Sequence, residues 1–192
     1  MDMVLNSLPG KTWYRLHLND KRIAVEADLE SLLPAASGDT SVYEENSTRC
    51  YPDMKTGSGP DVRTLTEGAA LCAVHTAEHT RMDAPVVLTY TSHDGKKEKS
   101  RLILHAEKGS TLRAVILQTA EEGDGLTVLQ TEILCEEDAK VELFMAQVLP
   151  AGFVLINDIG GTAAENASVV PRPAPACAGR RKHSPPPCRR CR

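Results

Sequence analysis

Short apolar stretches alternate with polar turns along residues 66–170 of this 192-residue chain. Each stretch has about the length of an ordinary strand, and few show the three-to-four-residue spacing and the caps of a helix. The predicted strands are Leu71–Val74, Val86–Tyr90, Leu102–Leu104, Leu112–Leu117, Leu126–Leu129, Val141–Val148 and Phe153–Ile156. The pattern indicates a mainly β domain and argues against alternating strands and helices.

A four-residue phrase recurs along this region. It starts with Gly, Asp or Asn, continues with a small and then a variable residue, and ends with an aliphatic residue. Its copies are Gly68–Leu71, Gly109–Leu112, Asp138–Val141 and Asn166–Val169, at steps of 41, 29 and 28 residues. Because Gly, Asn and Asp tolerate positive φ, the phrase predicts a tight turn that leads into a strand. A return every ~30 residues predicts the stacked coils of a solenoid.

The recurrence favours a partial parallel β-helix. An antiparallel sandwich or barrel is the main alternative, because its strands would show the same alternation of apolar and polar residues. In a β-helix, equivalent positions of successive coils stack, so we expect one aliphatic ladder and one corner that admits only small side chains. The ladder would contain Leu71, Leu112, Val141 and Val169, and the corner would contain Ala69, Ser110, Ala139 and Ala167.

Residues 1–65 are expected to form a hairpin and a flexible connection outside this core. Apolar residues alternate with polar ones over Tyr14–Leu18, and an Asn-Asp turn separates them from a return strand over Ile23–Ala27. Residues 28–65 are polar and weakly periodic, with one helical turn expected near Leu29–Leu33.

Charge is distributed unevenly along the chain. Residues 171–192 contain six Arg, one Lys and no acidic residue, so the net charge of −4 leaves −11 for residues 1–170. An acidic body argues against nucleic acid as the natural partner. A binding module whose basic tail contacts nucleic acid stays open as a further function, with salt-sensitive binding that deletion of the tail would abolish.

The tail, residues 171–192, is rich in Pro, Arg and Cys and holds 6 of the 12 prolines of the chain. It lacks the apolar residues that offset the entropy of ordering, so we expect it to be disordered. Its abrupt change of composition suggests a shifted reading frame near residue 170, which sequencing of the encoding DNA would test. The spacing of Cys188 and Cys191 is that of redox and zinc motifs, but nothing around them predicts a fold that would hold a metal.

The chain shows no apolar run of membrane-spanning length and no secretory leader. We therefore expect a cytoplasmic protein without a membrane partner. In that compartment Cys50, Cys72 and Cys135 would be reduced thiols.

Several segments resemble the SufB/SufD family of iron–sulfur cluster assembly proteins. Two of them, residues 100–112 and 131–143, resemble the family's core. Residues 157–162 resemble its recurring Gly-Gly segment, and Leu8-Pro9 followed by Thr12-Trp13 resembles an opening phrase of SufD-type members. The resemblance covers about residues 4–170.

The resemblance implies a right-handed parallel β-helix, of which residues 66–170 would be a part. It further implies a non-catalytic, SufD-like scaffold subunit that pairs with a SufB-type subunit and a SufC-type ATPase. The iron–sulfur cluster would then belong to the complex, and no cluster-contacting residue carries over to this chain. The chain departs from the family because the later coils and the helices that follow them are missing, so we expect a truncated fragment.

The candidate metal ligands are Cys72, His75 and His79. On a helix these three residues would share one face, but on the predicted strand Cys72 points away from His75 and His79, which weakens the site. The alternative function is a small cupin-like metal enzyme that uses His75, His79 and also His105 as ligands. No arrangement of residues in the sequence predicts a catalytic nucleophile or a phosphate loop.

Overall fold

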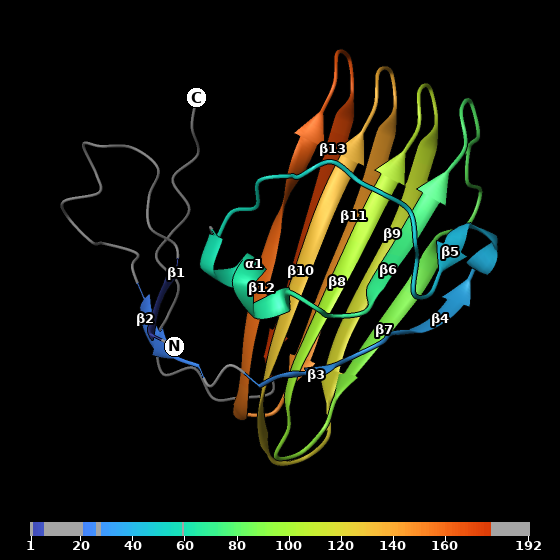
Figure 1. Cartoon of the computed structure of the whole chain (residues 1–192). Helices are drawn as coiled ribbons and strands as arrows, with labels where there is room; N and C mark the ends of the chain where they lie inside the picture. Colours follow the sequence, from blue (N-terminus) through green and yellow to red (C-terminus); the bar gives the residue numbers. More distant parts are fainter. Residues whose placement is uncertain (1, 6–20, 26–27, 59, 178–192) are drawn as a thin grey trace, which may run out of the picture.

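The computed structural model describes residues 2–5, 21–25, 28–58 and 60–177 (Figure 1). Its core is a β-solenoid of about four turns, in which each coil adds one strand to each of two parallel sheets. The first sheet contains β6 (Leu71–Thr76), β8 (Lys97–Ala106), β10 (Asp124–Cys135) and β12 (Gly152–Ala163). The second sheet contains β7 (Val86–Ser92), β9 (Thr111–Ala120), β11 (Lys140–Leu149) and β13 (Ser168–Cys177).

The expected partial β-helix is thus confirmed, and every predicted strand forms within this region. Successive strands within each sheet pair in parallel, for example β8 with β10 and β9 with β11. This pairing excludes the antiparallel sandwich and barrel, and with them the cupin-like fold of the alternative function. The strands are longer than predicted because polar residues at their ends continue the ladder, as Lys97–Arg101 does in β8.

The aliphatic ladder is confirmed at three of its four positions. Val141 of β11 lies between Leu112 of β9 and Val169 of β13. Leu71 is a wrong assignment, because it lies in the first sheet beside Arg101. The missing position belongs to Met82, whose N–H donates to the carbonyl of Thr111 at 3.1 Å.

The same correction applies to the turn phrase. Gly109, Asp138 and Asn166 have φ of 65°, 56° and 56°, as the phrase predicts. Gly68 also has positive φ, but it follows helix α1 (Pro60–Thr66) rather than opening a turn of the coil. The first coil turn uses His79, with φ of 56°, so the true steps are 30, 29 and 28 residues.

The interior between the two sheets is apolar. Its largest buried side chains include Leu88, Leu102, Leu104, Leu112, Ile116 and Leu143. Ser110 and Ala139 are each 1% exposed at the corner, as the small-residue position requires. Ala69 is not part of this corner, because it precedes β6 rather than β7.

Residues 28–65 form defined elements along the solenoid rather than a plain connection. In place of the predicted helical turn at Leu29–Leu33, Glu30–Ser31 is strand β3, which pairs in parallel with β8. Strand β4 (Ala35–Gly38) pairs antiparallel with β7, and β5 (Tyr43–Glu44) pairs antiparallel with β6 after the 3-10 turn η2 (Thr40–Val42). These two strands close both sheets at the first coil.

At the amino terminus, β1 (Asp2–Leu5) pairs antiparallel with β2 (Lys21–Ala24). The predicted strand over Tyr14–Leu18 lies outside the described residues, so the hairpin is described only through its return strand. The partner of that return strand is β1 rather than the predicted strand.

Helix α1 and the chain before it cover the outer face of the first sheet (Figure 1). A second apolar cluster joins this cover to the sheet: Val25, Leu29, Val62 and Leu65 of the cover pack with Val128 and Ile156 of the sheet. A polar row continues the contact: Thr66 Oγ1 donates to Gln130 Oε1 at 2.8 Å, and the Ser58 N–H donates to Asp158 Oδ1 at 2.7 Å. This cover positions the side chains discussed next.

At the other end, strand pairing continues beyond residue 170, where the sequence predicted the start of a disordered tail. Strand β13 pairs with β11 as far as Cys177. The rest of the predicted tail, residues 178–192, lies outside the described residues. Among the helices that the structure describes, none has the length and apolar character needed to cross a membrane.

Candidate metal-binding site

Two histidines are neighbours on the outer face of the first sheet. His75 of β6 and His105 of β8 occupy the same register position in successive coils. Their ring centroids lie 5.0 Å apart, with the ring planes tilted by 44°. In-register parallel pairing produces this contact directly, because side chains one coil apart stack on the same face.

A carboxylate one coil further on holds each imidazole. His75 Nε2 lies 2.6 Å from Glu107 Oε1, and His105 Nε2 lies 2.8 Å from Glu136 Oε1. Both glutamates stand at the start of the turns that follow β8 and β10. The same arrangement therefore occurs twice, one coil apart.

The second oxygen of each glutamate binds the backbone of the preceding turn. Glu107 Oε2 accepts the N–H of Glu78 at 2.9 Å, and Glu136 Oε2 accepts the N–H of Lys108 at 3.2 Å. Each glutamate thus ties its own coil to the coil before it. Two partners per carboxylate fix the orientation of the side chain.

The environment keeps Glu107 ionised. The hydrogen bond with His75 holds the pKa of its carboxyl below the usual range, and the Glu78 N–H acts in the same direction. Partial burial opposes these effects but does not cancel them. A deprotonated carboxylate beside imidazole is the form that binds cations.

The chain before α1 flanks the site. The ring of Tyr51 meets the ring of His105 edge-on, with centroids 5.8 Å apart and planes at 88°. Nearby, Arg49 forms an ion pair with Glu44. The hydrogen bonds from the Arg49 guanidinium lower the pKa of the Glu44 carboxyl. The His75 and His105 side chains are each 14% exposed, so solvent reaches both rings.

One ligand atom from each of His75, His105 and Glu107 can be chosen so that all three lie within 4.8 Å of one another. No other such group of three occurs in the part of the chain that the structure describes. Two imidazole nitrogens and one carboxylate oxygen form a donor set used by zinc and by other divalent transition metals.

The structure does not bring the sequence-predicted ligands together. Cys72 is fully buried and faces the interior, where it accepts a hydrogen bond from Tyr43 at 3.4 Å, and burial raises the pKa of its thiol. His79 lies in the first coil turn, with its ring against Gly109. Of the three proposed cupin-like ligands, only His75 and His105 meet.

Sequence reasoning missed Glu107 and Glu136, although a signal was present. His75 and His105 are 30 residues apart, which is one coil, and a glutamate follows each histidine by about one coil. The four-residue phrase predicted the first coil turn at Gly68, 41 residues before Gly109, instead of at His79. The 30-residue spacing of the first coil was therefore not recognised.

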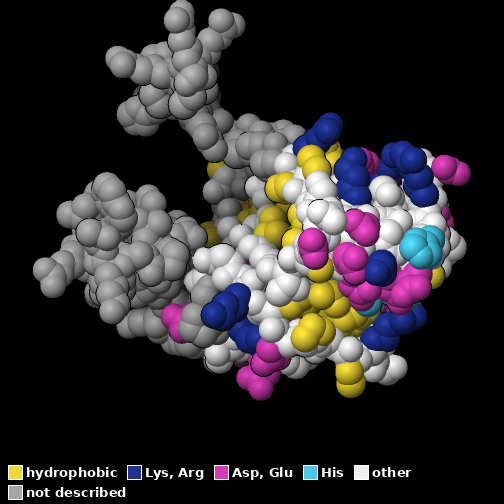
Figure 2. Space-filling model, turned by 90° about the horizontal axis from the view of Figure 1, so that it is seen from above, with side chains coloured by type: hydrophobic (Ala, Val, Ile, Leu, Met, Phe, Trp, Pro, Cys, Tyr) yellow, Lys and Arg dark blue, Asp and Glu magenta, His cyan; other side chains and the backbone are white. Residues whose placement is uncertain are grey.

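Charged side chains gather on the turns that join the first sheet to the second. Figure 2 looks onto this end and shows acidic, basic and histidine side chains side by side. Lys108 Nζ lies 2.7 Å from Glu137 Oε2 in the next turn. His75 and His105 lie directly below these turns, at the ends of β6 and β8, and their partners Glu107 and Glu136 open the turns that follow β8 and β10.

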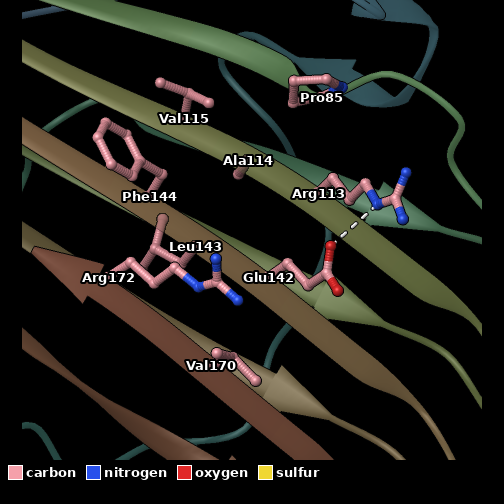
Figure 3. A pocket seen from close by; sticks show the side chains of 9 residues that line it. All are labelled: Pro85, Arg113, Ala114, Val115, Glu142, Leu143, Phe144, Val170 and Arg172. Carbon is pink, nitrogen blue, oxygen red and sulfur yellow. Dashed lines mark hydrogen bonds and ion pairs between the residues drawn. The ribbon is translucent and has the colours of Figure 1, made fainter.

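The outer face of the second sheet is different in character. An open groove of about 260 Å³ runs across β9, β11 and β13 (Figure 3). One side is the row formed by Val115, Phe144 and Arg172, and the other is the row formed by Arg113, Glu142 and Val170. Arg113 Nε and Glu142 Oε2 form an ion pair of 3.0 Å at its rim. Phe144 is 41% and Val148 is 49% exposed on this face.

Comparison of the whole chain with models of known protein families, with curated proteins and with solved structures finds no match.

Proposed function

We propose that the chain is a non-catalytic scaffold subunit of a SUF-type iron–sulfur cluster assembly complex, similar to SufD. The observation that supports this most directly is the stacked, parallel two-sheet solenoid. A parallel β-helix is also the fold that the resemblance of residues 100–112 and 131–143 to the SufB/SufD family implies. Solenoids of this kind act mainly through extended surfaces rather than through enclosed active sites.

The segments that carry the resemblance also occupy equivalent places in the coil. Residues 100–112 run through β8, its turn and the start of β9, and residues 131–143 run through β10, its turn and the start of β11. Because strand pairing places 102–106 beside 131–135, and 112 beside 141, these segments stack in register. If both segments belong to the core of the family, they are expected to occupy equivalent positions in successive coils, and these two segments do so.

The outer face of the second sheet is the surface we assign to a SufB-type partner. Phe144 and Val148 project from β11, and the groove beside Phe144 is bordered by Arg113 and Arg172. Apolar side chains rimmed by charges are typical of protein interaction sites. The outer face of the first sheet is unsuited to this role where residues 47–58 and 60–66 already cover it.

Co-purification tests the proposal. Tagged chain is expressed with SufB-type and SufC-type proteins, next to the double variant Phe144→Asp, Val148→Asp. The matched control is Val154→Asp, because Val154 is 47% exposed on the first sheet. We expect the wild-type chain and the control to retain the SufB-type protein, and the double variant to lose it. If the wild-type chain retains neither protein, the scaffold role is wrong; if the double variant retains both, the docking face is wrong.

A further inference from the structure

We propose that His75, His105 and Glu107 bind one divalent transition-metal ion, with Zn²⁺ as the representative ion. The inference does not rest on the scaffold role, since it concerns only the outer face of β6 and β8. It depends on three ligand atoms that already lie within 4.8 Å of one another on paired strands.

The ligand atoms of His75 and Glu107 need only a small adjustment to share an ion. Zinc binds imidazole nitrogen and carboxylate oxygen at about 2.0–2.2 Å, so two ligands of a tetrahedral ion lie about 3.3 Å apart. His75 Nε2 and Glu107 Oε1 are 2.6 Å apart as a hydrogen-bonded pair. Replacing the shared proton by a metal widens this distance by about 0.7 Å, which a side-chain rotation supplies.

The surrounding hydrogen bonds are those that metal sites use to orient their ligands. Metal-binding histidines usually give their other nitrogen to a carboxylate or a carbonyl group. His105 has such a partner in Glu136, at 2.8 Å. Glu107 in turn is held by the N–H of Glu78 at 2.9 Å. Glu136 is therefore a positioning residue outside the set of three ligands.

A comparison within the chain separates this site from an ordinary histidine–glutamate pair. His93 Nδ1 and Glu98 Oε1 also form a hydrogen bond, at 2.7 Å, but no second imidazole among the described residues joins them in a group of three. At the proposed site the second ring lies 5.0 Å from the first.

Three protein ligands leave a coordination position open. A tetrahedral ion would take water or an added ligand there, as in sites that are not purely structural. Both histidine side chains are 14% exposed, so solvent reaches the two rings. The ring of Tyr51 packs perpendicular to that of His105 on one side of the site.

Titration of the purified full-length chain with Co²⁺, after removal of bound metal with a chelator, tests the site. Co²⁺ reports nitrogen and oxygen ligation through its visible absorption, and thiolate ligation through a separate near-ultraviolet band. We expect one Co²⁺ per chain without the thiolate band, displaced by one equivalent of Zn²⁺. Glu107→Gln and His105→Gln should each weaken binding at least tenfold, and Glu136→Gln should weaken it about tenfold.

His93→Gln is the matched control and should bind Co²⁺ as the wild-type chain does. A measurement on the unmodified chain guards against variants that fail to fold: with ¹⁵N-labelled histidine, Zn²⁺ should shift two of the six imidazoles. The proposal is overturned if Co²⁺ finds no nitrogen and oxygen site, if the His105 and Glu107 variants bind as the wild type does, or if Zn²⁺ moves no histidine pair.

Discussion

The two sheets of the solenoid are alike on their inner faces and differ on their outer faces. Both present buried aliphatic side chains to the shared core. On the outer face of the first sheet, Val128 is fully buried and Ile156 is 5% exposed. On the outer face of the second sheet, Phe144 and Val148 are more than 40% exposed. The difference arises because Val25, Leu29 and the described residues 47–58 and 60–66 cover the first sheet and leave the second bare.

The covered and the bare outer faces also differ in their polar contacts. Beneath the cover, Asp158 is fully buried and binds the Ser58 N–H, and Arg101 reaches the 3% exposed side chain of Glu132 at 2.8 Å. On the bare sheet, the ion pair between Arg113 and Glu142 is partly open to water. Buried polar groups require fixed partners, so the covered sheet is the one with a defined arrangement of polar residues.

The largest expected effect separates the covered sheet from the bare one. Leu65 of α1 is 4% exposed against the first sheet, so Leu65→Ala should lower the free energy of unfolding by about 3 kcal/mol. Phe144→Ala removes a larger side chain from the bare sheet, yet it should cost only about 1 kcal/mol because the side chain is already 41% exposed. Chemical denaturation of both variants measures the difference. Equal losses would contradict the view that the two outer faces differ.

A second, smaller effect concerns the polar contact under the cover. Asp158→Ala leaves the Ser58 N–H without its acceptor, and we expect a loss of about 2 kcal/mol. Asp53 serves as the control in the same segment, because its side chain is 88% exposed although it is paired with Arg63. Asp53→Ala should cost less than about 0.5 kcal/mol. If thermal or chemical unfolding shows the reverse order, the covering segment is not fixed through Asp158.

A third effect is expected in acid. Since the hydrogen bond with His75 lowers the pKa of Glu107, the stabilisation from its ionised form is complete above the ordinary carboxyl pKa. It is lost as the pH falls through the lowered pKa. The free energy of unfolding of the wild type should therefore fall as the pH drops below about 4.5. In Glu107→Gln this fall should be smaller, by less than about 1 kcal/mol. Unfolding midpoints measured between neutral and acidic pH test this, with the exposed Glu122→Gln as control.

The sequence was sufficient for the repeat but not for its starting point. Gly109, Asp138 and Asn166 identified three turns, since residues that tolerate positive φ are rare and recognisable. The first turn uses His79, which a search for Gly, Asn or Asp does not find. Gly68 matches the four-residue phrase but follows the end of helix α1, where no coil turn begins. The ladder was therefore right at Leu112, Val141 and Val169 and wrong at Leu71.

The candidate site was harder to predict for the same reason. His75, His105 and Glu107 are neighbours only because one coil takes 30 residues at this place, and a register error of one residue would place a ring on the opposite face. Residues 28–65 show no periodic pattern of apolar residues, since their conformation depends on contacts with the sheets of the solenoid rather than on a repeat of their own. Short segments such as Glu30–Ser31 take their strand conformation from β8, not from local preference.

The smallest expected effect on stability concerns the edge strand β13. The Ser168 N–H donates to Ala139 of the preceding coil at 3.0 Å. Because N–H groups alternate along a strand, positions 169, 171, 173 and 175 direct theirs away from β11. Three of these four residues are Pro171, Pro173 and Pro175, which have no N–H. Proline thus removes donors from the edge of β13 with which no described strand pairs, while every donor to β11 is kept.

This arrangement predicts a change in association with little change in folding. Replacing Pro171, Pro173 and Pro175 by Val restores three donors on the open edge and should change the free energy of unfolding by less than about 1 kcal/mol. An exposed edge with a full set of donors is a template for pairing with another chain, so the triple variant should form larger species at concentrations where the wild type does not. Light scattering during a concentration series measures this. The matched control replaces Val170, Arg172 and Ala174 by Pro, which removes donors to β11 and should destabilise the last coil instead. If the Val variant stays monodisperse, proline is not what protects this edge.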